Sequence, residues 1–373
     1  MDFTYNEEQR MLTDSLRRLV VEQWGFEQRR KRARQPELDR DAWQALVDLG
    51  IAGLLVPEQY DGFGESPATM AAIQLELGRG LVSEPVIPST VMATTALLSS
   101  GNDTIQAECL PRMVTGEWIA TVAYLEGDQC NGLTPSVTQA VAAAGGFTLN
   151  GSKKLVWQGV RATHLIVSAV LDGTMALFWI PADTASVSLK DYPTIDGDRC
   201  ATIALDDVAL PETALIAQGQ EANAALAAAI DYGIAALCAH AAGAMQRLIE
   251  ITVDYLKTRQ QFGRPLADFQ ALQHRLADML VRQELAASMA YVAAAALGEA
   301  DPSERRRQLS SAKVSIAETG RYVGQNAVQL HGGIGMTDEL EVGDYFKRLT
   351  YADYLLGNTD YHLTQLEALY HQA

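Results

Sequence analysis

Two segments of this chain carry side chains suited to hold phosphate groups. Residues 259–273 read RQQFGRPLADFQALQ, and residues 327–339 read AVQLHGGIGMTDE. An arginine guanidinium and glutamine amides bind phosphate oxygens in fixed geometry, particularly where a helix ends. The first segment therefore predicts a site for a long cofactor that carries phosphates, and the second segment is expected to complete it.

Composition limits the class of protein. The chain has 373 residues, of which 48% are hydrophobic and 20% charged, so it is expected to form two or three packed units of a soluble globular protein. The formal net charge of −17 would repel a nucleic-acid backbone. Two short basic runs, Arg29–Arg32 and Arg305–Arg307, are interpreted as solvated helix faces. We expect no nucleic-acid partner.

The cysteines and the first residues predict a cytoplasmic location. The four cysteines stand far apart without a CxxC pair, which argues against disulfides and a zinc site. The start, MDFTYNEEQR, is acidic where a secretory signal needs a basic and then an apolar run. The most apolar later stretch is interrupted by Asp231 and His240. We therefore expect reduced, buried thiols and no membrane segment.

The elements that must position the two segments alternate in type along the chain. Apolar spacing predicts helices at 6–24, with Asn6 as the cap, and at 41–49, 68–79 and 91–98. Residues 1–120 are therefore expected to form an all-helical domain. From about 121 to 215, β-branched and aromatic runs at 163–168, 176–180 and 201–205 predict an antiparallel β-domain, a barrel or a sandwich.

The rest of the chain, residues 216–373, is expected to be helical again. Residues 221–258 are apolar nearly all round, which predicts a buried central helix about 55 Å long. Further helices are expected after Asp268, from Asp301-Pro302, and at 361–370. The fold class is therefore α+β.

Three longer motifs, WQALVDLGIAGLLVPEQYDGFG, TRQQFGRPLADFQALQHRLADM and VQLHGGIGMTDE, resemble the acyl-CoA dehydrogenase family over almost the whole chain. Within the family, GDYFKRLT and LLGNTDYH are similar to the small subunit of pimeloyl-CoA dehydrogenase, and to paired subunits that oxidise steroid side-chain acyl-CoAs. The resemblance implies a C-terminal four-helix bundle that oligomerises. It also implies FAD, an acyl-CoA substrate, α,β-dehydrogenation and an electron-transfer flavoprotein as acceptor.

The resemblance also implies that the ADP half of each FAD is held by the dimer partner. Glycine allows a ligand to approach the backbone closely. The resemblance therefore implies residues of this chain that would bind the ADP half of the partner's FAD. Arg259 would contact the pyrophosphate and Phe262 would lie near the adenine. Further residues along the same half would be Gln270, Gln329, Gly332 and Gly333.

The positions that the family uses for its catalytic carboxylate differ in this chain. The base usually precedes a Gly-Thr pair near the C-terminus, and that position is Leu356; the alternative position on the long helix is Gly233. Candidate replacements for the base are Asp353, Asp360 and Asp231. Asp231 lies only two residues from Gly233, so it is expected on roughly the opposite face of the helix. His240 is interpreted as a satisfied core histidine.

The β-domain also departs from the family at its flavin contacts. Leu125-Glu126 stands where the family has Thr-Glu, and Leu155, Val156 and Trp157 stand where it has Trp-Ile-Thr. Glu126, Trp157 and Gln158 are candidates for other contacts to the flavin ring.

These differences predict the small subunit of a hetero-oligomer, an α2β2 assembly with a larger homologous subunit that supplies the catalytic glutamate. A homo-oligomer with a relocated carboxylate base and a non-redox structural or acyl-CoA-binding homologue are the two alternatives.

Overall fold

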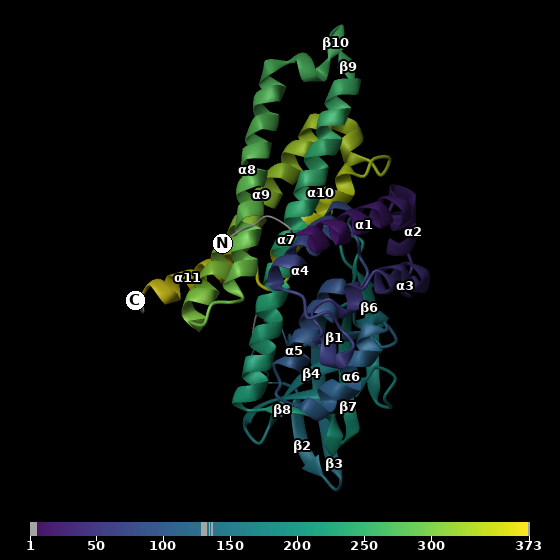
Figure 1. The fold of residues 1–373 in the computed structure, drawn as a ribbon, viewed down its shortest axis with the longest axis vertical. Coiled ribbons are helices and arrows are strands. Elements are labelled where there is room, and N and C mark those ends of the chain that lie inside the picture. The colour runs from purple at the N-terminus through teal and green to yellow at the C-terminus, as the bar shows by residue number, and fades with distance from the viewer. Residues whose placement is uncertain (1–5, 128–132, 134, 136, 372–373) are drawn as a thin grey trace.

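The computed structural model describes residues 6–127, 133, 135 and 137–371, and Figure 1 shows their arrangement. The sheet lies at one end of an elongated molecule, the long helices α7 and α8 reach to the other end, and the N-terminal helices lie beside the middle of α7. The predicted fold class, with a helical region, a β region and a second helical region, is confirmed. The expected limits at 120 and 215 stay predictions.

The N-terminal helices follow the caps and spacing of the sequence. Their bounds are α1 (Glu7–Gln23), α2 (Phe26–Ala33), α3 (Arg40–Asp48), α4 (Pro67–Arg79), α5 (Thr94–Leu98) and α6 (Asp103–Val114). Asn6 caps α1 as predicted, because its side chain accepts from the backbone N–H of Gln9. A π-helical stretch, Val86–Ala93, leads into α5, so that helical segment begins five residues earlier than expected.

The middle of the chain forms one sheet of eight strands among the described residues, in the order β6-β7-β3-β2-β4-β5-β8 with β1 beside β4. The strands are β1 (Ala120–Ala123), β2 (Gln139–Ala143), β3 (Gly146–Trp157), β4 (His164–Leu171), β5 (Thr174–Pro181), β6 (Val187–Pro193), β7 (Arg199–Pro211) and β8 (Leu215–Gln218). The purely antiparallel expectation is wrong in one respect. Both β1 and β2 pair with β4 in parallel, so the sheet is mixed.

The C-terminal region is a bundle in which α7, α8 and α9 contact one another, α10 packs on α7 and α9, and α11 packs on α9. Its elements are α7 (Gln220–Thr258), β9 (Gln260–Gln261), β10 (Arg264–Pro265), α8 (Gln270–Ala296), α9 (Pro302–His331), α10 (Val342–Tyr354) and α11 (Thr359–Tyr370). Helix α7 has the expected length and apolar character. It is long and apolar enough to span a membrane, but 78% of its apolar window is buried inside the protein, as in a core helix.

Glycines and ion pairs join α7 to the N-terminal helices. A Cβ on Gly78 of α4 would meet the carbonyl oxygen of His240 at 1.9 Å, and one on Gly243 of α7 would meet that of Leu75 at the same distance. Only glycine therefore lets these two helices approach so closely. An ion pair of 2.8 Å between Arg79 of α4 and Glu250 of α7 also joins these two helices. Arg17 of α1 pairs with Glu76 of α4 at 2.6 Å, and Arg29 of α2 pairs with Glu341 at the start of α10 at 2.7 Å.

The two basic runs are only partly solvated, which corrects one expectation. The guanidinium of Arg29 is buried because it pairs with Glu341 and Asp344 from the segment that leads into α10. Arg305 pairs with the buried Asp231 of α7, whereas Arg307 is exposed and pairs within α9. Both runs therefore serve partly to join helices of this chain.

Helix α8 leaves part of its apolar surface uncovered. Leu280, Val281 and Leu285 are 49%, 69% and 57% exposed, and they lie on the side of α8 that no other described element covers. Three large aliphatic side chains on one exposed helix face are typical of a protein–protein contact. The uncovered surface of α8 is defined by these three residues.

Candidate functional site

The two segments that were predicted to bind a cofactor meet at one end of the bundle. The ring of Tyr255, in the last turn of α7, stacks on His331 at the end of α9 with ring centres 4.3 Å apart. Its hydroxyl also donates to the carbonyl oxygen of His331 at 3.3 Å. Arg259 follows one helical turn after Tyr255, and its backbone N–H bonds to the Tyr255 carbonyl. The structure therefore brings the RQQFG and HGG segments together.

The side chains at this end are exposed and have few contacts within the chain. Arg259 is exposed and forms no ion pair with any described residue. Phe262 is 88% exposed at the tip of the β9–β10 hairpin, where its positive φ of 54° and the glycine that follows form the turn. Gln270 starts α8 and is also exposed. A cation and an aromatic ring directed at solvent are what a ligand from outside the chain would contact.

In the second segment, residues 327–339, the backbone is accessible at Gly332 and Gly333. Gln329 is exposed in the last turn of α9, and Gly332 and Gly333 begin a short 3-10 turn at residues 332–336. A Cβ on either glycine would meet no described atom within 4 Å. Gly332 has a φ of 65°, so its conformation favours glycine, whereas no contact within this chain requires glycine at 333.

An apolar cavity of about 300 Å³ lies between the sheet and the α10–α11 connection. Its described lining consists of Pro88, Met92, Thr121, Val122, Tyr124, Leu125, Leu155, Trp157, Tyr351, Tyr354, Leu355, Leu356 and Asn358. No Asp or Glu is among these residues. Of these residues, only Leu125, Leu155, Trp157 and Leu356 could be placed near the site from the sequence, because strands and helices far apart in the chain supply the rest.

The two family positions for the base are neighbours in space. A Cβ on Gly233 of α7 would lie 2.9 Å from Cδ1 of Leu356 and 3.0 Å from two atoms of Met92. The leucine therefore occupies the space that a side chain on α7 would need. Both positions adjoin the cavity, and neither carries an ionisable group.

Hydrogen bonds from Lys313 and His362 hold the loop that carries Leu356 in place. Leu356 has a φ of 59° and Gly357 a φ of 98°. The ammonium of the buried Lys313 donates to the carbonyl oxygens of Asp353 and Gly357 at 2.9 and 2.8 Å. His362 lies 3.0 Å from the carbonyl oxygen of Leu356. These bonds fix a left-handed backbone that a leucine rarely adopts.

The candidate replacement bases are bound elsewhere. The carboxylate of Asp353 accepts from the backbone N–H and hydroxyl of Thr359, the first residue of α11, and pairs with Arg321 at 2.9 Å. That of Asp231 pairs with Arg305 at 3.1 Å. Asp360 is exposed in the first turn of α11. None of the three lines the cavity among its described residues.

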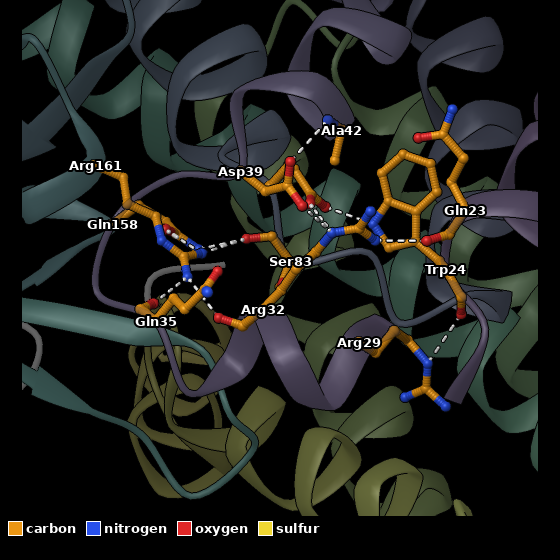
Figure 2. A network of polar contacts seen from close by, with 11 residues as sticks. Gln23, Trp24, Arg29, Arg32, Gln35, Asp39, Ala42, Ser83, Gln158 and Arg161 are labelled. Carbon is orange, nitrogen blue, oxygen red and sulfur yellow. Dashed lines mark hydrogen bonds and ion pairs between the residues drawn. The ribbon is translucent and has the colours of Figure 1, made fainter. Parts of the chain in front are cut away.

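The side chains expected at the flavin ring are bonded within the chain. The indole N–H of Trp157 donates to the buried Asp198 at 2.8 Å. The amide of Gln158 donates to the carbonyl of Ser83 at 2.7 Å and to Asp198, and its oxygen accepts from Arg161. Figure 2 shows Gln158 turned toward Ser83 and Arg161, at the contact with the N-terminal helices.

Glu126 belongs to a buried ion pair of the sheet. Its carboxylate accepts from Lys153 at 2.6 Å and from the backbone N–H groups of Val137 and Thr138. Lys153 is fully buried, and burial lowers the pKa of its ammonium to about 8. Breaking such a buried pair by removing one partner would leave an uncompensated charge, so this carboxylate is engaged within the β region. Its expected contact with the flavin ring stays a prediction.

Behind Trp157 lies a further group of buried charges. Arg348 pairs with Asp196 at 2.7 Å, and its guanidinium lies 3.4 Å from Nε2 of His240. Burial lowers the pKa of His240 to about 3 and raises that of Asp198. His240 is a buried core histidine as expected, but it is satisfied only in part, because Nδ1 has no hydrogen-bond partner among the described residues.

Models of the N-terminal and C-terminal domains of acyl-CoA dehydrogenases match residues 6–117 and 223–369. The chain belongs to the acyl-CoA dehydrogenase family, whose members are FAD-dependent oxidoreductases that act on the CH–CH group of an acyl-CoA.

Among its relatives, the acyl-CoA dehydrogenase IpdE2 of Mycolicibacterium smegmatis is 30% identical over 97% of this chain and 99% of its own length. FadE27 of Mycobacterium tuberculosis is 28% identical over 87% and 86%. A solved variant of the Tcur3481-Tcur3483 steroid ACAD is 29% identical with a TM-score of 0.88, covering 98% of both chains.

The two halves of the site fit FAD to different degrees. At the Arg259 end, an unpaired guanidinium and an open glycine backbone match a pyrophosphate and its neighbouring groups. At the cavity, the polar groups of Trp157 and Gln158 are already engaged, and these residues do not fit a flavin ring as its hydrogen-bond partners.

Proposed function

We propose that this chain is the non-catalytic subunit of a hetero-oligomeric acyl-CoA dehydrogenase. In this proposal it binds the ADP half of an FAD whose ring lies in a larger homologous partner, and the partner supplies the carboxylate. When bound, FAD would supply the acceptor for the β hydride, and the partner's carboxylate would take the α proton of the acyl thioester. This chain's residues hold the pyrophosphate and position the cofactor.

The observation that carries the proposal is the contrast between the two halves of the site. Arg259 and Phe262 are exposed and available to a ligand. Leu356 and Gly233, in contrast, carry no base, and the Leu356 side chain occupies the space next to Gly233. The uncovered surface of α8 further supports a protein partner, because large aliphatic side chains are exposed on one helix face. The solved Tcur3481-Tcur3483 steroid ACAD, whose name joins two chains, agrees with an assembly of two different chains.

Flavin counting on the co-purified complex tests the proposal. The complex should contain one FAD for every two chains, and this chain purified alone should retain none after desalting. Oxidation of acyl-CoA should require both chains, with an electron-transfer flavoprotein or a dye as acceptor. One FAD bound per chain in this protein alone would refute the proposal and favour a homo-oligomer.

The identity of the catalytic carboxylate can be tested separately. Asp353→Asn and Asp231→Asn in this chain should lower stability without abolishing activity per folded complex, because both carboxylates hold positions within the helical bundle. Loss of activity from a folded Asp353→Asn complex would instead support a relocated base.

A further inference from the structure

A second, much smaller cavity of about 10 Å³ lies where α4 crosses α7, next to Trp157. A single water molecule needs roughly 10–15 Å³, so this cavity has room for one water and little else. Polar cavities of this size hold water, whereas apolar ones stay dry. Five of the described lining residues are polar or charged and at most 6% exposed: Gln74, Glu84, Asp198, His240 and Arg348.

The close contact of α4 with α7 directs two polar side chains at this small cavity. A Cβ on Gly78 would meet the carbonyl oxygen of His240 at 1.9 Å, so the backbones of the two helices touch at this point. Gln74 precedes Gly78 by four residues, which places both on the same face of α4. The amide of Gln74 and the ring of His240 therefore line one cavity from facing helices whose separation is fixed.

The hydrogen bond to Arg348 determines which ring nitrogen of His240 carries the proton. Nε2 of His240 lies 3.4 Å from Nη1 of Arg348, and a guanidinium can only donate, so Nε2 is the acceptor. Burial and the charge of Arg348 lower the pKa of His240 to about 3, so the ring is neutral and its one proton is on Nδ1. The Nδ1–H group is therefore a donor, and it has no partner among the described residues.

The side-chain oxygen of Gln74 is the complementary group. It is a hydrogen-bond acceptor, it is buried, and it also has no partner among the described residues. A buried donor or acceptor left without a partner lowers stability, because it has lost its contact with bulk water and gained nothing in exchange. One unpaired donor and one unpaired acceptor on the same small cavity are what a bridging water molecule satisfies together.

We propose that this cavity binds one ordered water molecule, which accepts from Nδ1–H of His240 and donates to the side-chain oxygen of Gln74. The carboxylate of Glu84 lines the same cavity and offers an acceptor for the second hydrogen of the water. The bound water joins α4 to α7, and it keeps His240 in the tautomer that accepts from Arg348 of α10. This water site is independent of the proposed function, because none of its residues belongs to the segments 259–273 and 327–339.

A crystal structure of the full chain, at a resolution that shows ordered waters, tests the proposal directly. The wild-type protein should show one density peak within hydrogen-bond distance of both Nδ1 of His240 and the side-chain oxygen of Gln74. In Gln74→Met, which has a side chain of similar length without the amide, the peak should weaken or disappear. An empty cavity in the wild-type protein, or a peak that Gln74→Met leaves unchanged, would overturn the proposal.

Urea unfolding of Gln74→Met, His240→Gln and the double variant measures whether the two side chains share one water. The glutamine amide can replace Nε2 of His240 toward Arg348 but not Nδ1. Each single variant should lower the urea midpoint, because each removes one partner of the water. The double variant should lower the midpoint by clearly less than the sum of the two shifts, since the second change removes a bond that the first has already weakened.

Gln106→Met provides the matched control for this measurement. Gln106 is also a buried helical glutamine, but its amide donates directly to the carbonyl oxygen of Leu97 at 3.0 Å, and it does not line the small cavity among its described residues. Combined with His240→Gln, this change should give additive shifts of the urea midpoint. Additive shifts for the Gln74 pair, or equal deviations from additivity in both pairs, would contradict a shared water.

Discussion

The polar side chains at the outer end of α7 and those beside the cavity at the α10–α11 connection differ in their partners. At the outer end, Arg259 and Gln270 point into solvent without an ion pair among the described residues. Beside the cavity, Trp157, Gln158 and Asp198 satisfy one another inside the protein. The first region is built to contact something outside the chain, whereas the second is complete by itself.

The largest effect should come from the exposed end. If Arg259 binds the FAD pyrophosphate as proposed, Arg259→Ala should remove a charge-assisted bond worth about 1.5–3 kcal/mol, which corresponds to roughly a 10- to 150-fold loss of FAD affinity in the complex. Flavin release followed by fluorescence would measure it. Lys257→Ala, which removes another exposed cation two residues earlier, should leave FAD affinity within about twofold. Equal losses from both variants would reduce the role of Arg259 to general electrostatic attraction.

Trp157→Phe should cost stability in the interior region. The change removes the N–H that Asp198 accepts and leaves a buried carboxylate with one fewer donor, at about 1–3 kcal/mol of unfolding free energy. Urea unfolding of the chain measures this change. Trp118→Phe serves as the control, since no hydrogen bond from the Trp118 indole is recorded in the described residues and the aromatic packing is kept. A smaller loss at Trp157 than at Trp118 would show that Asp198 is not dependent on the indole.

Acid should destabilise the same interior region. The pKa of His240 falls from about 6.5 to about 3 on burial beside Arg348. The unfolded chain therefore binds the proton first, and the free energy of unfolding falls as the pH falls from 6.5 toward 3. At pH 5 this costs up to about 2 kcal/mol. His240→Gln should flatten the decline, whereas His274→Gln on exposed α8 should not. An unchanged slope in His240→Gln would contradict the assignment.

Gly233→Ala should have a small effect, below about 1 kcal/mol, because the atoms that it meets are the flexible ends of Leu356 and Met92. Gly243→Ala on the same helix is the contrasting control. Its Cβ would meet a backbone oxygen at 1.9 Å, and we expect a loss of about 3 kcal/mol. In a Leu356→Ala background, the cost of Gly233→Ala should shrink. Additive effects in the double variant would show that the two positions are independent.

The smallest expected effect is that of Leu356→Glu. A carboxylate at this position would enter the cavity, but the polar groups of Trp157 and Gln158 would still be engaged. The chain purified alone should therefore remain without flavin and without dehydrogenase activity. Flavin binding by this single variant would indicate that the cavity needs only a base to become an active site.

Local signals in the sequence predicted much of the fold. Asn6 caps α1, Asp301 caps α9, and the apolar run of α7 ends where expected, because caps and helical spacing act within a few residues. The parallel pairing of β1 and β2 with β4 was not predictable, since strand direction depends on how long connections cross the sheet.

The candidate site was likewise predictable only where its residues are close together in the sequence. The exposed segments around Arg259 and Gln329 are continuous in sequence and could be identified from their motifs. The cavity residues Met92, Tyr124 and Tyr351 come from three different elements, and nothing in their local sequence indicates that they meet. The contact between Gly233 and Leu356 likewise depends on the tertiary packing of α7 against the α10–α11 connection.

The uncovered surface of α8, together with Phe262, has a practical consequence for anyone producing this protein. The chain on its own presents these four large apolar side chains to water and to other copies of itself. If the proposed hetero-oligomer exists, the yield of this chain in the soluble fraction should depend on the amount of the second chain made in the same cell, and the apparent mass of the chain made alone should rise with concentration. Under the proposal, co-expression is the practical route to a well-behaved sample.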